Sequence, residues 1–361
     1  MQFNLKNFVQ RHDKFRLWAI LLILVLAVVG GVLVWFTYTN TDSELTNIAY
    51  QIDPGVVESG FTAQDYNIPD SAEKVTTGIY IDRIKSISLK DNLWTVDFYV
   101  WFKWSGGIDP GQSFQVVDGS MDSKELIKNS TNGAENFSLY KVTSTITKKF
   151  DMFRFPVDTQ FLTIDIMDTQ NGRQALVYIP DNESSGVGPD VNVQGYYIEG
   201  LKTVEKPFYY NTTMGDPTLE NTTYSQFRTG VLINREDLTF LFISLIGILI
   251  AVFAGLMSLL IMSYQGRFSL EGSAMFVGIT NMVLITNLAP TGIVTLGHLI
   301  TAYGLFIIAL CLLESAISIS YHKRGEEAFS RKLDLLTLKI LAIGFIITVA
   351  ALIFAAWFPY Y

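Results

Sequence analysis

Six residues between positions 269 and 287 could together line a path for water and ions. They recur at intervals of three and four residues, so on an α-helix they share one face. They are Ser269, Ser273, Phe276, Thr280, Val283 and Asn287. A ring of such helices would surround water with hydroxyl and amide groups and narrow it at Phe276 and Val283, where apolar rings can close a pore by excluding water. The same small polar residues could instead pack helices against one another.

Enzyme chemistry finds little support in the sequence. The chain has 361 residues, with one cysteine, Cys311, and three histidines. A single cysteine excludes an intrachain disulfide and a multi-cysteine metal site, and no nucleophile–base pair or phosphate-binding loop is recognisable. The net charge of −8 argues against nucleic-acid binding. We therefore expect a protein that is not an enzyme, holds no metal or cofactor and binds no nucleic acid.

Five apolar runs predict transmembrane helices in a chain that is 49% hydrophobic and 17% charged. Each run is close to the ~20 residues that cross a bilayer. The runs cover residues 17–38, 238–262, 269–289, 293–320 and 340–358. Basic residues before the first run and after the second and fourth predict a cytoplasmic N-terminus (1–16) and an extracellular C-terminus in the plasma membrane. We expect the first run to be an uncleaved anchor; the alternative is a cleaved signal peptide.

The remaining segment, outside the membrane by this topology, has the pattern of a β-domain. A stretch rich in Asp, Pro, Ser and Gly, 39–72, is expected to be a linker. In 94–104 apolar and polar residues then alternate, which is the period of a half-buried strand. Similar runs separated by turn residues predict an antiparallel, Ig-like β-sandwich over 73–235. The other expected strands are 79–89, 140–150, 161–167, 196–201 and 224–234.

Two further features of this segment fit an extracellular location. Acidic residues outnumber basic ones within it, whereas basic residues are in excess in the rest of the chain. All five N-x-S/T sequons lie in it and are candidate glycosylation sites. They are Asn129, Asn136, Asn182, Asn211 and Asn221.

The segment Phe155-Pro-Val-Asp-Thr-Gln160 and several motifs around it occur in an order known from one family. The accompanying motifs are Thr77-Gly-Ile-Tyr80, Phe102-Lys-Trp104, Gly195-Tyr-Tyr-Ile198, Arg235 and Leu312-Leu-Glu314. From about Val75 to its C-terminus the chain thereby resembles the pentameric ligand-gated ion channels (the Cys-loop receptor superfamily), in their prokaryotic, cysteine-free branch. The chain departs from that family in lacking a W-x-P motif and the proline of the first channel helix, and in having an extra N-terminal span.

The resemblance implies a homopentamer in a lipid bilayer that conducts inorganic ions. The span 269–289 would line the pore, Gln265 would lie at its cytoplasmic mouth, and Phe276 would be the gate with Val283 as a second one. The four channel spans would form a helical bundle over 236–361. The acidic outer domain favours cations over anions. Glu271 either faces the pore, where it would attract cations, or pairs with Arg267 four residues earlier.

The resemblance also implies residues that couple the β-domain to the membrane helices. Phe155, Pro156 and Asp158 belong to the loop that faces the membrane in the family, and Arg235 precedes the first channel helix. We expect Asp158 and Arg235 to form an ion pair, with Asp91 as a third member; the alternative is a surface salt bridge of little energetic value.

Four tyrosines are candidates for ligand binding, because aromatic rings attract cationic groups such as amines. They are Tyr99, Tyr209, Tyr210 and Tyr224. A small extracellular ligand would act through them, or protons would act through carboxyl groups. A different function is also open: a non-conducting, membrane-anchored sensor or scaffold that reuses the same fold.

Overall fold

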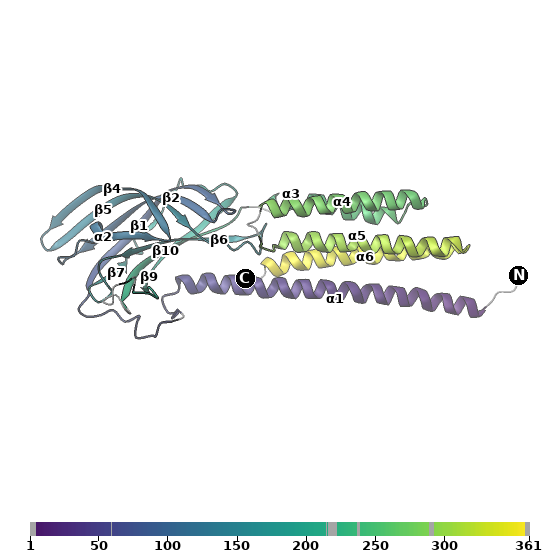
Figure 1. The fold of residues 1–361 in the computed structure, drawn as a ribbon, viewed down its shortest axis with the longest axis horizontal. Coiled ribbons are helices and arrows are strands. Elements are labelled where there is room, and N and C mark those ends of the chain that lie inside the picture. The colour runs from purple at the N-terminus through teal and green to yellow at the C-terminus, as the bar shows by residue number, and fades with distance from the viewer. Residues whose placement is uncertain are drawn as a thin grey trace. The chain divides into compact units, whose positions relative to one another are not determined.

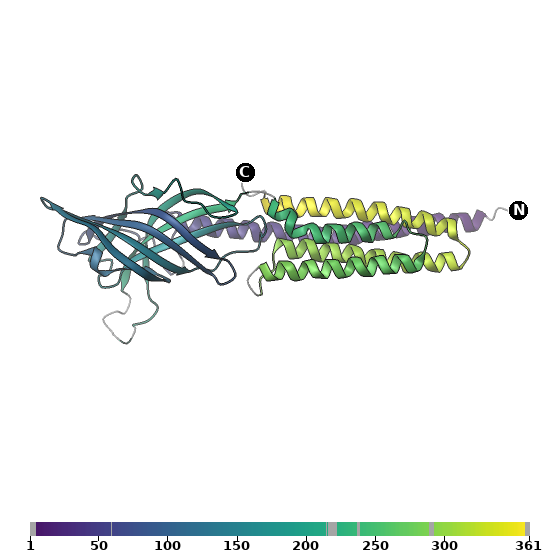
Figure 2. The same ribbon diagram turned by 90° about the horizontal axis from the view of Figure 1, so that it is seen from above.

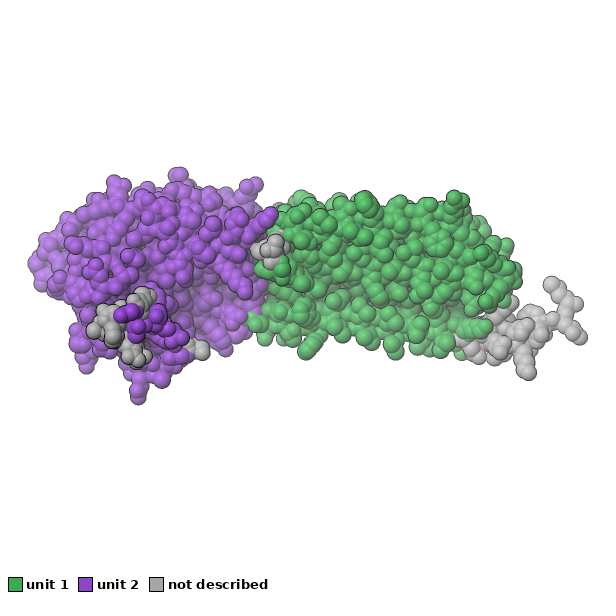
Figure 3. Space-filling view, viewed as in Figure 1, with its two compact units in different colours: residues 1–43, 152–158, 237–361 green, residues 44–151, 159–236 purple. Residues whose placement is uncertain are grey.

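The computed structural model describes residues 5–58, 60–213, 215, 222–236, 239–288 and 292–357, with side chains from residue 14 onward (Figure 1). The chain divides into two compact units (Figure 3). The helical unit contains residues 1–43, 152–158 and 237–361, and the β-unit contains residues 44–151 and 159–236.

Five long helices are apolar enough to cross a membrane. They are α1 (Leu5–Ile52), α3 (Thr239–Ser258), α4 (Tyr264–Leu288), α5 (Leu296–Lys323) and α6 (Glu327–Trp357). In Figure 2 the green and yellow helices α3 to α6 run side by side. This arrangement agrees with the membrane protein that the apolar runs predict.

Two of these helices are longer than the apolar runs suggest. Helix α1 continues to Ile52, so the expected linker begins as helix. Polar side chains there bond to carbonyls of their own helix: Asn40 Nδ2 donates to Phe36 O at 2.8 Å and Thr41 Oγ1 to Thr37 O at 2.9 Å. Such local bonds satisfy polar groups without ending a helix. Helix α6 likewise begins before its apolar run, at Glu327.

The β-unit contains two sheets. One has the strand order β4-β5-β2-β1-β7, with β8 also on β1, and the other has the order β3-β6-β10-β9. The first sheet is formed by β1 (Glu73–Ser88), β2 (Leu93–Trp104), β4 (Gly119–Asn132), β5 (Glu135–Thr147), β7 (Leu176–Pro180) and β8 (Gly186–Val187). The second is formed by β3 (Phe114–Val117), β6 (Thr159–Asp168), β9 (Tyr196–Tyr209) and β10 (Thr223–Arg235), and the short helix α2 (Pro110–Ser113) precedes β3. The pairs are antiparallel except that β1 lies parallel to β7 and β8.

Alternation along the strands produces a core that both sheets share. On β2 the apolar positions of the predicted strand are all buried. The Phe102 ring lies 5.1 Å from that of Phe114 in the other sheet. The backbone N–H of Tyr178 on β7 donates to Ser225 Oγ on β10 at 3.0 Å. The sandwich core thus follows from the period-2 pattern.

The strands that the sequence analysis did not predict are short or polar. Strand β4 is exposed along almost its whole length and lies at the edge of its sheet. Charged and polar side chains suit an exposed edge, because they discourage pairing with other chains. Such a strand carries no apolar alternation by which sequence could reveal it.

Candidate functional site

The predicted pore stripe is one uninterrupted exposed face of α4. All seven candidates, Gln265, Ser269, Ser273, Phe276, Thr280, Val283 and Asn287, are exposed. Phe276 is 72% exposed and Val283 54% exposed, so the described part of this chain leaves much of both side chains uncovered. The hydroxyls of Ser273 and Thr280 donate to carbonyls of their own helix, four residues earlier, at 2.9 Å. These two hydroxyls are therefore satisfied within their own helix.

The opposite face of α4 packs against its neighbours. Its buried residues are Arg267, Glu271, Ala274, Gly278, Asn281 and Ile285. They recur at the same spacing as the stripe but half a turn away. Asn281 Nδ2 donates to Thr301 Oγ1 on α5 at 3.2 Å. Helix packing within the chain is thus assigned to this second face, and the small polar residues of the stripe do not serve it.

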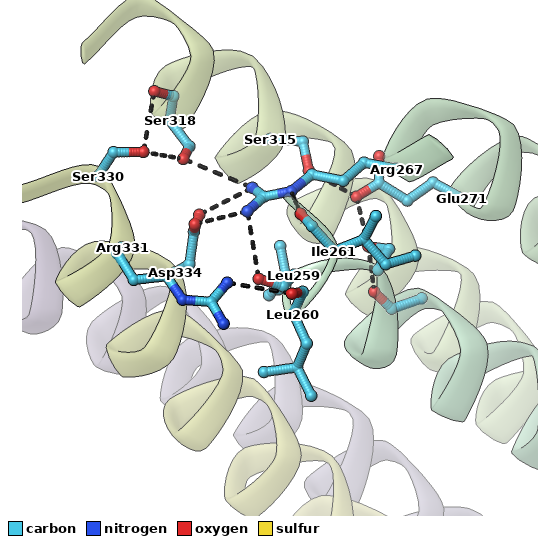
Figure 4. Close-up of polar contacts among 12 residues, drawn as sticks. Leu259, Leu260, Ile261, Arg267, Glu271, Ser315, Ser318, Ser330, Arg331 and Asp334 are labelled. Carbon is cyan, nitrogen blue, oxygen red and sulfur yellow. Dashed lines mark hydrogen bonds and ion pairs between the residues drawn. The ribbon is translucent and has the colours of Figure 1, made fainter. Parts of the chain in front are cut away.

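A buried ion pair joins α4 to α6 (Figure 4). Arg267 is 3% exposed, and its two terminal nitrogens donate to the two carboxylate oxygens of Asp334 at 2.9 and 2.6 Å. Arg267 also donates to the carbonyls of Ile261 at 2.6 Å and Leu259 at 3.3 Å. One guanidinium thereby binds the turn after α3 and the start of α6. Bidentate pairs of this kind are the strongest charged hydrogen bonds in proteins.

Glu271 neither pairs with Arg267 nor lies on the exposed stripe. Its side chain is buried, and its Oε1 accepts hydrogen bonds from Ser258 on α3 at 2.7 Å and from Ser315 on α5 at 2.6 Å (Figure 4). The reason is that residue 271 falls on the buried face of α4, where Arg267 already has Asp334 as its partner. Both roles considered for Glu271 are therefore replaced by a structural one.

A second buried carboxylate, Glu314, lies on α5. It is fully buried, and neither of its oxygens has a hydrogen-bond partner of ordinary geometry among the described residues, although the Thr337 hydroxyl is near enough to stabilise its charge. Ionisable groups at such positions are costly and usually face the interior of a bundle. Helices α3 to α6 thus enclose a polar interior at one end.

The loop that carries the motif beginning at Phe155 packs within the helical unit. The carbonyl of Phe153 accepts from the N–H of Leu296 at 2.6 Å, and that of Phe155 accepts from the N–H of Gly297 at 3.1 Å. The rings of Phe155 and Phe240 on α3 lie edge to face, 5.5 Å apart. Pro156 and Asp158 are also buried. A loop between two strands of the β-unit thereby contacts the beginnings of α3 and α5.

The remaining coupling candidates belong to the β-unit. The Arg235 guanidinium lies over the Tyr196 ring, 4.2 Å from its centre. Asp91 lies in the turn between β1 and β2, is exposed, and accepts a hydrogen bond from Ser88 Oγ at 2.6 Å. The expected pairing of Asp158 with Arg235 remains a prediction.

The four candidate tyrosines are not one cluster. The Tyr210 ring lies 5.1 Å from the Phe208 ring and 5.9 Å from the Tyr224 ring, so Tyr210 and Tyr224 belong together, where β9 ends and β10 begins. Tyr209 contacts Phe61 instead, with ring centres 5.1 Å apart. Tyr99 lies on β2, where its hydroxyl accepts from Lys141 Nζ at 3.3 Å. An aromatic site on one chain would therefore use Tyr210 and Tyr224.

The segment between α1 and β1 is bound along the edge strand β9. Arg173, which is 3% exposed, donates to the carbonyls of Asp65, Tyr66 and Asn67 and pairs with both oxygens of Glu205 at 3.0 Å. Lys206 Nζ donates to the carbonyl of Tyr50, in the last turn of α1, at 2.7 Å. A cation at this position satisfies a carbonyl that the helix leaves unpaired. We call residues 53–67 the strap.

A row of charges continues from the strap across the second sheet. Glu58 Oε1 lies 3.1 Å from Lys206 Nζ and 3.0 Å from Arg228, which also pairs with Asp165 at 2.9 Å. Burial raises the pKa of Asp165, and the Arg228 charge opposes this rise. Burial also lowers the pKa of the nearby Lys148 to about 8. This surface of the sheet therefore holds charges that are partly withdrawn from water.

Four of the five sequons lie in described parts of the β-unit. Asn129, Asn182 and Asn211 are exposed and Asn136 is half-buried, whereas Asn221 lies outside the described residues. Asn182 Oδ1 accepts a hydrogen bond from Thr203 Oγ1. The described residues contain no group of three or more His, Cys, Asp or Glu side chains that could hold a metal ion.

No protein-family model matches this chain, and a comparison with curated proteins finds no significant match.

Two parts of the site were not predicted from the sequence: the Arg267–Asp334 pair and the strap. Asp334 lies in a stretch of charged residues that resembles a loop between helices, and only the longer α6 reveals that its side chain points into the bundle. No local pattern links Asp334 to Arg267, because the two residues are 67 positions apart in the sequence. The strap binds mainly through backbone carbonyls, which carry no sequence pattern.

Proposed function

We propose that the chain is the subunit of a pentameric ion channel that is gated from its β-unit, an Ig-like sandwich outside the membrane. The observation that carries the proposal is the exposed stripe of α4. An amide such as that of Asn287 is unfavourable against lipid. The hydroxyls of the stripe, although they donate to their own helix, can also accept hydrogen bonds from water in a water-filled path. Five copies placed around an axis would line such a path, with Phe276 and Val283 as apolar rings that exclude water when the channel is closed.

The loop at Phe155 supports gating from the β-unit. Backbone hydrogen bonds join it to the start of α5, and an aromatic contact joins it to α3. A rearrangement of β5 and β6 would therefore be transmitted to the helices that hold α4. A ligand opens such a channel only if it binds the open form more tightly than the closed form. Small cationic ligands at Tyr210 and Tyr224 or protons are the proposed activators, and cations are the proposed conducted ions.

Cysteine substitution along α4 tests this proposal. Water-soluble thiol reagents modify a cysteine only where water reaches it. In channels reconstituted in bilayers, we expect Ser273→Cys and Thr280→Cys to be modified with a change in current, while Ala274→Cys on the buried face is not. The buried Cys311 of the unmodified protein supplies the blank.

A different pattern of modification would reject the pore assignment. Equal reactivity at Ala274→Cys and Ser273→Cys would mean that the stripe is not a distinct water-facing surface. Absence of any current from folded, oligomeric protein with every activator tried would favour the alternative of a non-conducting sensor anchored in the membrane.

A further inference from the structure

An apolar groove runs between α1 and α6 in the helical unit. Its volume is about 700 Å³, within the range of about 300–1,000 Å³ that is typical of small-molecule pockets. On α1 it is lined by Ala27, Gly30, Gly31 and Val34, and on α6 by Ile347 and Ala351 among others. Both helices are among the five that are long and apolar enough to cross a membrane.

Two adjacent glycines explain why the groove exists. A Cβ at Gly30 would lie 2.7 Å from Thr348 Oγ1, so glycine permits the close approach of α1 to α6. A Cβ at Gly31 would have no atom within 4 Å. The first glycine therefore brings the helices together, and the second leaves the space beside their contact line empty.

The chemistry of the groove favours a hydrocarbon chain. None of its lining residues is charged, and the hydroxyl of Thr348 already donates to Tyr303 Oη at 3.0 Å. Water requires several polar partners, and away from Trp35 and Tyr38 the side chains of the lining offer only the Thr348 hydroxyl, which is already bonded. An empty groove would lose the dispersion contacts that its walls could make.

One end of the groove carries the amphipathic residues of a membrane interface. Trp35 and Tyr38 line that end and are 68% and 46% exposed. Tryptophan and tyrosine are enriched where the hydrocarbon meets the headgroups. A lipid could thus place its headgroup near these rings and its acyl chain toward Ala27.

We propose that the groove between α1 and α6 binds one acyl chain of a membrane lipid. The bound chain fills the space beside Gly31 and joins α1 to α6 through contacts on both sides. This site depends only on the helical unit and is expected whether or not the protein conducts ions.

Photolabelling of the full-length protein tests the site. The probe is phosphatidylcholine with a diazirine in the middle of one acyl chain, added as a minor component to phosphatidylcholine vesicles that contain the protein. Mass spectrometry then locates the adducts. We expect adducts to concentrate at the groove residues Ala27, Gly30, Gly31, Val34, Ile347 and Ala351. Fewer should form at Ile20 and Ile343, which are 62% and 59% exposed elsewhere on the same helices.

Two variants sharpen the test. Gly31→Phe fills the groove from a position where its Cβ meets no protein atom, and it should reduce groove adducts to the level of the exposed positions. Val32→Phe is the matched control, because Val32 is 59% exposed and does not line the groove, and its adducts should equal those of the unmodified protein.

Three results would overturn the proposal. The first is an even spread of adducts over the exposed faces of α1 and α6 in the unmodified protein, a measurement that needs no variant. The second is an unchanged groove signal in folded Gly31→Phe. The third is efficient disulfide formation between two copies of Gly31→Cys in vesicles, which would assign the groove to a second copy of the chain.

Discussion

The buried pair of Arg267 and Asp334 gives the most quantitative prediction about the helical unit. Asp334→Asn removes the negative charge and one of the two acceptors, so the buried Arg267 guanidinium keeps the amide oxygen at 334, the carbonyls of Ile261 and Leu259 and the weakly placed Ser318 hydroxyl. Breaking a buried ion pair from one side costs about 3–5 kcal/mol. Because those oxygens still compensate part of the charge, we expect a loss near the lower limit, about 3 kcal/mol.

A double-mutant cycle separates this pair from its surroundings. Arg267→Met is expected to lower the free energy of unfolding more than Asp334→Asn does. It removes the donors of the buried Asp334 carboxylate and also those of the carbonyls of Ile261 and Leu259. In the double variant Arg267→Met/Asp334→Leu no charge is left unpaired. The double variant is compared with the single variants Arg267→Met and Asp334→Leu. We expect its loss of unfolding free energy to be about 2–3 kcal/mol smaller than the sum of the two single losses.

The assay is equilibrium unfolding of the purified protein in mixed micelles, followed by circular dichroism. Arg331→Met is the matched control, because Arg331 is only half-buried and donates to one carbonyl, that of Leu260, at 3.1 Å. It should cost about 1 kcal/mol or less. Additivity of the two single substitutions within about 0.5 kcal/mol would show that the two residues do not interact as described.

Three further predictions concern the β-unit. The pKa of Lys148 is lowered by burial from 10.5 to about 8, so the folded protein releases this proton more readily than the unfolded one. The free energy of unfolding should therefore rise between about pH 8 and pH 10.5, by at most about 1.4 kcal/mol per pH unit. Thermal unfolding at several pH values should show a smaller rise in Lys148→Gln. An identical pH profile in this variant would show that Lys148 does not cause the rise. Arg173→Ala removes the donors to the strap and leaves Glu205 without its ion pair, so we expect a loss of about 3 kcal/mol and faster proteolysis within residues 53–67; an unchanged cleavage rate would show that the strap is held by other contacts. Gly230→Ala would place a Cβ 2.0 Å from the Phe161 ring, and the resulting overpacking should lower stability by about 1–3 kcal/mol, whereas Gly200→Ala, with no atom within 4 Å, should cost much less in the same unfolding assay.

The sequence reveals those parts of the fold that are encoded by a local period. The alternation in 94–104 predicts β2 and the side chains it buries, because one face of a strand must be apolar where two sheets meet. The spacing of the α4 stripe predicts a single face, and the structure shows that face exposed. In both cases neighbouring residues carry the whole signal.

Features that depend on distant partners could not be predicted in this way. The sequence leaves Glu271 either to pair with Arg267, four residues earlier, or to face the pore, yet each residue has its partners on other helices. Strand β4 has no apolar alternation because it is an exposed edge. The continuation of α1 to Ile52 runs through polar residues that resemble a linker in composition but bond to their own helix. Long-range pairing decided the positions of Glu271 and Arg267, whereas β4 and the end of α1 lack the apolar period by which a sequence reveals an element.

Currents across a planar bilayer test the central claim most directly. Purified protein and the Phe276→Ala variant are compared without activator in asymmetric potassium chloride. Because Phe276 is the proposed apolar gate, we predict that the variant conducts continuously while the unmodified protein stays closed, with a reversal potential that follows the potassium gradient. Silence of both proteins, although both are folded and oligomeric, would contradict the account, and a reversal potential that follows chloride would contradict its assignment of the conducted ion.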